Sequence, residues 1–271
     1  MKKVAIIGAG ISGLFIANLF KKNSKYEITI FEKKTSVGLD ESYGVQLSVN
    51  SIKLLNEIGF EKLKHSEKFT PEKINFFSNN ISNKICELNI SNFNSNGLKY
   101  TTLKRSSLVN FLKKDLEDLI KTGYNISKID QKDKLIKLYF ENGKVKECDY
   151  LIISDGVFSK CKSLISNNQT KPKFNNTLAI RGIIKDLSKK IDNKNISLFL
   201  SSNFHQVIYP INPNGDLNFI AIMQFSLSED EQKNYSLFSD KSFIKKILDK
   251  APPSVQDILE NLKDIKIFLY L

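Results

Sequence analysis

A glycine-rich segment near the N-terminus, residues 4–20, constrains the fold of this chain more than any other feature. Val4–Ile7 is a short apolar run of strand type, and Gly8, Gly10 and Gly13 follow it at G-x-G-x-x-G spacing before an uninterrupted helical pattern. In a βαβ unit such glycines make the strand-to-helix turn, admit a pyrophosphate close to the backbone and let the helix pack on the strand. The segment therefore predicts a dinucleotide-binding turn at a helix N-terminus.

The residues after the motif support a true nucleotide site. The alternating run 26–31 predicts a second strand, and Glu32 follows it nineteen residues after Gly13. An acid at this position accepts hydrogen bonds from ribose hydroxyls and repels a 2′-phosphate. The alternative is a glycine-rich turn without a ligand, because a lone G-x-G-x-x-G is weak evidence. At this point both NAD and FAD stay open.

The net charge of +12 raises the question of nucleic-acid binding. Of the 41 basic residues, all but Arg105 and Arg181 are Lys, and they are spread along the chain. Recognition of phosphates and base edges favours the arginine fork, so this composition predicts no nucleic-acid partner. The two arginines are candidates for sites that need a planar, bidentate donor. The alternative is that these two arginines are kept by chance and have no such role.

Composition also limits the compartment and the class of protein. No apolar run approaches the ~18 residues of a membrane span, and the N-terminal apolar run is broken too early for a signal peptide. Three separated cysteines and two histidines predict neither a disulfide framework nor a metal site. We therefore expect a protein of the reducing cytoplasm, with no membrane span and no metal.

Three further helices and a series of strands follow from the hydrophobic patterns. Residues 44–60 predict a turn at Gly44 and a helix with Leu54, Leu55 and Ile58 on one face, and residues 105–123 predict one amphipathic helix. Strands are expected within 71–103, in a hairpin that turns at 141–143, at 151–153, and from 174 onward in a mostly β portion with a helix at 240–250.

A series of short motifs runs through the chain in order. They are the G-x-G-x-x-G of Gly8–Gly13, the acid Glu32, the G-x-Q-L-x-x-N segment Gly44–Asn50, Arg105 before a leucine-rich helix, D-x-L-I-x-x-D-G-x-x-S at Asp149–Ser159, Arg181-Gly182 and Tyr209-Pro210. Together they make the chain resemble the FAD-dependent aromatic hydroxylases, the single-component flavoprotein monooxygenases that include salicylate and para-hydroxybenzoate hydroxylase.

The resemblance implies an α/β fold with two domains. A Rossmann-like FAD-binding domain is expected from residues 1–70 and 101–167, and a mostly antiparallel β substrate domain from 71–100 and 168–271. The resemblance also favours FAD over NAD. A domain for NAD alone would not need Asp155-Gly156 to return to the first sheet, and the sequence has no second G-x-G-x-x-G for a separate nicotinamide domain.

The same resemblance implies roles for individual residues. Glu32 is expected at the adenosine ribose, Arg105 near the FAD pyrophosphate, and Asp155-Gly156 at flavin and nicotinamide contacts. Further FAD-binding residues are expected to be Gly8, Gly10, Ser12, Gly13, Lys33 and Gln46. Arg181 is expected close to the flavin or the substrate as the candidate catalytic residue, with a surface ion pair as its alternative.

In the family, NAD(P)H reduces FAD, O₂ adds to the flavin, and a hydroxyl passes to an electron-rich ring. The resemblance therefore implies an NAD(P)H-using monooxygenase of a small aromatic or phenolic substrate. Two alternatives stay open: a non-catalytic remnant that binds FAD or an adenine nucleotide, and a flavin-dependent dehydrogenase of the same superfamily.

The sequence departs from the family pattern in three places. Ile153-Ser154 stands where Gly-Ala is usual, and Lys162 stands where an Arg often follows the motif serine. The family's G-D-A-A-H segment, whose Asp holds the ribityl chain and pyrophosphate, has no counterpart up to residue 271, because Gly215-Asp216 is expected in a hairpin turn. We therefore expect a hydroxylase-like chain that lacks the family's C-terminal part.

Overall fold

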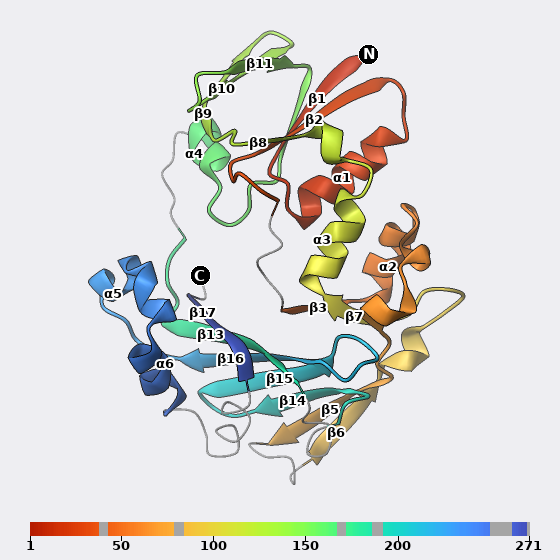
Figure 1. Ribbon diagram of the computed structural model, residues 1–271, viewed down its shortest axis with the longest axis vertical. Helices are drawn as coiled ribbons and strands as arrows, with labels where there is room; N and C mark the ends of the chain where they lie inside the picture. The colour runs from red at the N-terminus through yellow and green to blue at the C-terminus, as the bar shows by residue number, and fades with distance from the viewer. Residues whose placement is uncertain (38–42, 79–83, 167–171, 186–191, 250–261, 270–271) are drawn as a thin grey trace. The chain divides into compact units, whose positions relative to one another are not determined.

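The computed structural model describes residues 1–37, 43–78, 84–166, 172–185, 192–249 and 262–269 (Figure 1). The chain divides into two compact units. The first combines residues 1–41 with 106–172, and the second combines residues 42–105 with 173–271. Each unit has its own sheets and its own apolar core.

The first unit is built on a parallel sheet of strand order β12-β1-β2-β8. Its elements are β1 (Lys2–Ile7), α1 (Ile11–Lys21), β2 (Tyr26–Glu32), β8 (Ile120–Thr122) and β12 (Tyr150–Ile153). The apolar run Val4–Ile7 is buried, as a strand between two parallel neighbours requires. The predicted βαβ unit and the return of the Asp155-Gly156 segment to this sheet are confirmed.

A second, antiparallel sheet completes the first unit, with the short helix α4 (Lys160–Ser166) beside it. It consists of β9 (Ile126–Lys132), β10 (Leu135–Phe140) and β11 (Val145–Cys148). The predicted hairpin is present, and Gly143 takes the left-handed conformation of its turn, with φ of 76°. Phe31 of the parallel sheet and Phe140 of the antiparallel sheet share one core, with ring centroids 4.8 Å apart.

The prediction of one helix over 105–123 is wrong in its second half. Helix α3 spans Arg105–Lys113, a short 3-10 turn, η4, spans Glu117–Leu119, and β8 follows. Asp115 has φ of 65°, which interrupts the helix, and Leu116 is fully buried. β8 adds to the edge of the parallel sheet, where Ile120 pairs with Ile30. Sheet pairing therefore overrides a helical pattern of apolar residues.

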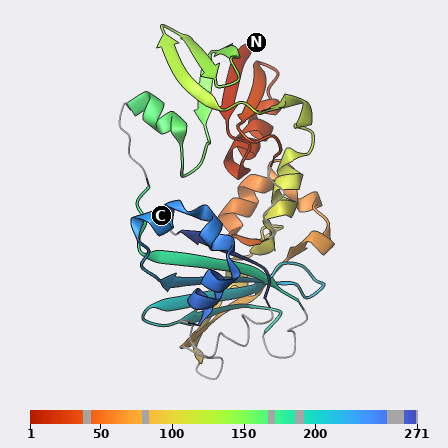
Figure 2. The same cartoon turned by 60° about the vertical axis from the view of Figure 1, so that its left-hand side comes forward.

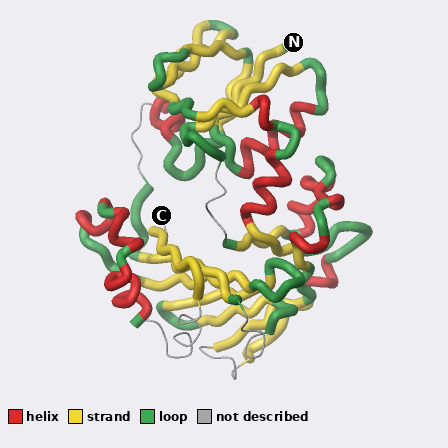
Figure 3. Tube along the Cα trace, in the orientation of Figure 1, coloured by secondary structure: helices red, strands yellow, loops and turns green. Residues whose placement is uncertain are grey.

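The second unit is dominated by a seven-stranded sheet of order β17-β13-β16-β15-β14-β5-β6, drawn in yellow in Figure 3. Its strands are β5 (Lys73–Ser78), β6 (Lys84–Asn89), β13 (Thr177–Ile184), β14 (Ile196–Leu200), β15 (Phe204–Pro210), β16 (Leu217–Gln224) and β17 (Leu262–Leu269). All neighbours are antiparallel except β5 and β14. A mostly antiparallel β portion was predicted, and the α/β fold class is confirmed.

Two helices lie beside this sheet, α5 (Glu229–Lys233) and α6 (Lys241–Leu248), in blue in Figure 2. Phe243 and Ile247 of α6 pack into the same core as Leu178 and Phe219 of the sheet. The helix predicted over 240–250 is therefore present, and its apolar stripe faces strands, which is how an amphipathic helix covers a sheet.

A small three-stranded sheet of order β3-β7-β4 and helix α2 complete the second unit. Their bounds are β3 (Gly44–Leu47), α2 (Val49–Asn56), β4 (Lys68–Phe69) and β7 (Thr101–Lys104). Gly44 lies in a strand and not in the predicted turn; a Cβ there would come within 2.7 Å of Ile211 Cγ2. The helix ends before Ile58, and Leu54 is 50% exposed, so Ile52 and Leu55 form the buried face instead.

Residues 42–70 belong to a different unit from the one that the sequence suggested. That boundary placed residues 1–70 in one domain, whereas contacts place 42–70 in the second unit. Residues 101–105 move with them, because β3 and β4 pair with β7 and this small sheet is bonded to the large one. The N–H of Gly44 donates to Asn218 Oδ1, and the Thr102 hydroxyl donates to the Pro210 carbonyl oxygen. The assignment of this segment to a FAD-binding domain stays a prediction. Among the described helices, none is both long and apolar enough to span a bilayer.

Candidate functional site

The loop between β1 and α1 requires glycine at two positions because a larger side chain would overlap the protein's own backbone. Gly8 has φ of 103°, and its N–H donates to the carbonyl of Phe31 at 2.8 Å. A Cβ on Gly8 would overlap the carbonyl oxygen of Ser154, and a Cβ on Gly13 would overlap the carbonyl oxygen of Gly8. These two glycines hold the turn and the close approach of helix to strand.

Gly10 is different, because no described atom of the chain requires it to be glycine. Its φ is −80°, and a Cβ there would meet no atom within 4 Å among the described residues. Gly10 is the N-cap of α1, and the helix hydrogen bonds begin with Leu14 N–H to the Gly10 carbonyl. The N–H groups before Leu14, including that of the exposed Ser12, therefore precede the helix ladder. Space at Gly10 and such N–H groups are what a phosphate needs.

Glu32 ends β2 and reaches back to the glycine loop. Its Oε2 accepts a hydrogen bond from the N–H of Ala9 at 2.9 Å, and its Oε1 accepts one from the N–H of Lys34 at 3.0 Å. A carboxylate oxygen can accept more than one hydrogen bond, so Glu32 can hold the loop and still accept from ribose hydroxyls. Lys33, beside it, is exposed.

Asp155 and Gly156 follow β12, which pairs in parallel with β1, and Gly156 has φ of 80°. Asp155 Oδ2 accepts a hydrogen bond from the N–H of Cys161 at 3.0 Å, whereas its buried Oδ1 has no partner among the described residues. Burial raises the pKa of Asp155, but hydrogen bonds from Ser159 and Cys161 outweigh it, so the net pKa lies below the ordinary value. Because buried polar atoms are normally hydrogen-bonded, we expect the Oδ1 oxygen to accept a hydrogen bond from a bound ligand.

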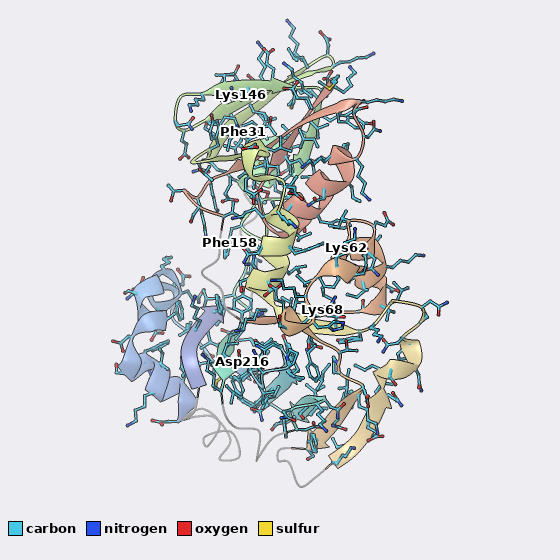
Figure 4. All side chains as sticks on the ribbon, turned by 45° about the vertical axis from the view of Figure 1, so that its right-hand side comes forward. Phe31, Lys62, Lys68, Lys146, Phe158 and Asp216 are labelled. Atoms are coloured by element: carbon cyan, nitrogen blue, oxygen red, sulfur yellow. The ribbon has the colours of Figure 1, made fainter. Side chains whose placement is uncertain are left out.

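One cavity of about 380 Å³ in the first unit brings these groups together. The predicted site residues that line it are Gly8, Gly10, Glu32, Lys33, Asp155 and Gly156. Its apolar wall includes Phe31 and the 56% exposed Phe158, both labelled in Figure 4. Ser12 and Gly13 lie in the adjoining first turn of α1 and do not line the cavity.

The remaining predicted site residues, Gln46, Arg105 and Arg181, belong to the second unit. Gln46 lies on β3, and its Oε1 accepts a hydrogen bond from the Tyr100 hydroxyl at 2.7 Å. Arg105 begins α3, and its backbone N–H donates to the Tyr43 carbonyl at 2.9 Å.

Arg181 lies on β13, half-buried between aromatic rings. Its guanidinium carbon is 4.4 Å from the ring centroid of Tyr43 and 5.9 Å from that of Phe268. The two rings are themselves edge to face, with centroids 6.1 Å apart. Its contacts on these rings are of cation–π type. The role of Arg181 near the flavin or the substrate, and its alternative as a surface ion pair, stay predictions.

Sequence reasoning missed the residues that surround Arg181. Tyr43 and Phe268 are 225 positions apart in the chain. Pairing of β17 with β13 brings Phe268 close to Arg181, and Tyr43, directly before β3, meets both. Tyr209, noted only as part of a Tyr-Pro pair, is 1% exposed; burial raises its pKa, which the positive charge of Arg181 offsets only in part. The one available signal was that Tyr43 directly precedes the Gly44–Asn50 motif.

The thiols of the buried cysteines are unreactive, and the second Gly-Asp pair lies outside this site. Burial raises the pKa of Cys148 to about 11 and that of Cys161 to about 12, so both thiols stay protonated and unreactive at neutral pH. Gly215-Asp216 lies in the β15–β16 turn, as predicted, where Asp216 pairs with Lys104 at 3.0 Å. Asp216 is labelled in Figure 4.

The first unit has a Rossmann-like fold with a cavity at its glycine loop. Residues 6–45 match the model of the NAD(P)-binding Rossmann-like domain family. The chain is 27% identical over 168 residues to the FAD-dependent monooxygenase dpasE of Apiospora sacchari, covering 58% of this chain and 34% of that protein. It is 22% identical to salicylate hydroxylase of Pseudomonas putida, covering 82% of this chain and 54% of that protein.

The fold agrees with these relatives. HpxO of Klebsiella pneumoniae, solved with FAD and uric acid, superposes with a TM-score of 0.85 over 99% of this chain and 68% of that chain, at 14% identity. The resemblance and fold class predicted from the motifs are therefore confirmed: the relatives are FAD-dependent aromatic monooxygenases, and the chain has the fold of FAD-dependent hydroxylases. The chain spans about a third to a half of the length of the two curated relatives named.

Proposed function

We propose that this protein binds FAD in its first unit and acts as an NAD(P)H-using monooxygenase of a small aromatic or phenolic molecule. The observation that carries the proposal is the cavity at the end of the parallel sheet. There Gly10 leaves open space, Glu32 supplies a carboxylate, and Asp155 supplies a buried oxygen that has no partner among the described residues. The similarity to FAD-dependent monooxygenases gives the same assignment.

Each group has a defined task toward FAD. The N–H groups at the start of α1 and the space above Gly10 receive the pyrophosphate, with Ser12 and Gly13 in the same turn. Glu32, beside Lys33, binds the adenosine ribose, and Oδ1 of Asp155 accepts a hydrogen bond from the cofactor. Arg105, at the pyrophosphate, and Gln46 are proposed as FAD contacts from the family resemblance alone. When bound, FAD supplies the chemistry with O₂ that the protein groups cannot.

Arg181 is proposed as the residue that positions the substrate. A guanidinium stacked on Tyr43 and Phe268 is fixed in orientation and presents its N–H donors in one plane. Such a donor suits the carboxylate or phenolate of an aromatic acid. The cytoplasmic location is proposed from the free thiols of Cys86, Cys148 and Cys161, which match a reducing compartment.

A Gly10→Val variant tests the FAD site. Its side chain would occupy the space of the pyrophosphate, so flavin absorbance that co-purifies with the protein should be lost. The thermal unfolding temperature of the flavin-free protein should stay unchanged, because the new Cβ meets no atom of the described chain within 4 Å. Undiminished flavin in the variant would refute the site, and Gly10→Ala gives a graded comparison.

Turnover separates the proposed activity from its two alternatives. With phenolic acids, NAD(P)H and O₂, a monooxygenase consumes oxygen and forms a hydroxylated product. A dehydrogenase oxidises its substrate with an artificial electron acceptor in the absence of O₂, and a binding module retains FAD without turnover.

A further inference from the structure

A second cavity, of about 440 Å³, lies in the second unit, and none of the predicted site residues lines it. It is bordered by α2, by strand β4 and by the 3-10 turns η1 (Phe60–Lys62) and η2 (His65–Glu67). Its floor is apolar, because Ile52 and Phe60 are each only 2% exposed. Small-molecule sites have volumes of about 300–1,000 Å³, so the cavity is large enough for a ligand.

Lys68 brings a partly buried positive charge into this cavity. Its Nζ lies 3.3 Å from the Glu61 carbonyl oxygen, 3.5 Å from the Phe60 carbonyl oxygen and 5.2 Å from the centroid of the Phe60 ring. Within the described chain no carboxylate forms an ion pair with it. Burial lowers the pKa of Lys68, which means that its charge is incompletely compensated.

The other polar groups of the cavity complement this charge. Lys99 is exposed at its rim, so among the lining residues two lysines, Lys68 and Lys99, outnumber the single carboxylate, that of Glu61. Asn56 also lines the cavity, and its buried Oδ1 has no hydrogen-bond partner among the described residues. Because buried acceptors are normally hydrogen-bonded, we expect a ligand in this cavity to donate to Asn56 Oδ1 from a hydroxyl or N–H group.

We propose that this cavity binds a small carboxylate that has a hydrocarbon body and one hydroxyl group. The carboxylate lies on the ammonium group of Lys68, the hydrocarbon packs on Ile52 and Phe60, and the hydroxyl donates to Asn56 Oδ1. The apolar floor favours such a molecule over inorganic phosphate, whose whole surface is polar. This site is separate from Arg181 and does not depend on the proposed activity.

Calorimetric titration of the full chain with mandelate, which has a phenyl ring, a carboxylate and a hydroxyl, tests the proposal. Saturable binding is expected, and mandelamide, which has the same shape without the charge, should bind at least about tenfold more weakly. Lys68→Met, which keeps an apolar stem, should reduce mandelate affinity by about the same factor. Lys62→Met is the matched control and should change nothing, because Lys62 is exposed and does not line the cavity (Figure 4).

A second variant keeps the test independent of how Lys68→Met folds. Thr70 is exposed at the cavity, so Thr70→Trp should fill the cavity and abolish mandelate binding without disturbing the core. Because mandelate is also an aromatic acid of the kind proposed for Arg181, the titration is repeated in an Arg181→Met background, where the binding that Lys68→Met removes should persist. Absent binding, equal affinity for mandelate and mandelamide, or binding that depends on Arg181 and not on Lys68 would overturn the proposal.

Discussion

The two units build their candidate sites in different ways. In the first unit the cavity is made of backbone turns and of residues at strand ends, such as Glu32, the last residue of β2, and Asp155, two residues after β12. In the second unit Arg181 is held by Tyr43 and Phe268, which come from distant parts of the chain. A short sequence motif can predict a site that is made by local backbone geometry. A site made by side chains on paired strands depends on sheet register, which no short motif predicts.

Gly13→Val should have the largest effect of the predicted changes. Its Cβ would overlap the Gly8 carbonyl oxygen, so we expect a loss of about 3 kcal/mol in the free energy of unfolding. Chemical denaturation measures this change. Gly10→Val is the matched control, because its Cβ meets open space. Equal stability of the two variants would mean that the glycines of the loop do not differ in the way described.

Arg105→Lys should weaken FAD binding by about 1–3 kcal/mol if the guanidinium holds phosphate through its planar fork. The measurement is a fluorescence titration of flavin with the apoprotein. Lys104→Arg, at the adjacent position, leaves the charge unchanged and controls for nonspecific effects. Equal dissociation constants for wild type and Arg105→Lys would assign Arg105 a structural role only.

Tyr43 and Arg181 should show a coupling energy of about 1 kcal/mol in a double-mutant cycle, the usual range for a partly buried cation–π pair. Tyr43→Leu, Arg181→Met and the double variant are compared by chemical denaturation. Phe268→Leu should show a weaker coupling to Arg181, because its ring centroid is 5.9 Å away and not 4.4 Å. Additive effects of Tyr43→Leu and Arg181→Met would contradict the contact.

Asp155→Asn should produce the smallest effect, a loss of stability above about pH 4 that disappears in acid. The pKa of Asp155 is lower in the folded chain than its ordinary value, so its carboxylate stabilises the fold above about pH 4 and loses this effect as the pH falls through the lowered pKa. The unfolding free energy of Asp155→Asn should therefore depend less steeply on pH between about 5 and 3. Identical slopes would show that the hydrogen bonds to Asp155 do not favour its ionised form.

Features that depend on residues close together in the sequence were predicted, and features that depend on distant residues were not. The hairpin at Gly143 and the strands of the large sheet were predicted, because alternation and an Asn-Gly turn act within a few residues. The second half of the helix over 105–123 was predicted wrongly, because pairing of β8 with β2 overrides its apolar stripe. The small sheet containing Gly44 was missed for the same reason, since its partner β7 lies far along the chain.

The sequence alone determined the βαβ unit, its glycine loop and the acid Glu32, because each depends on backbone conformation and spacing within about thirty residues. Only the tertiary structure decided which glycine faces open space, since Gly8, Gly10 and Gly13 look alike in the sequence. It also decided that Arg181 lies between Tyr43 and Phe268 and that Lys68 faces a cavity. Those contacts depend on strand pairing between distant segments, which no local pattern encodes.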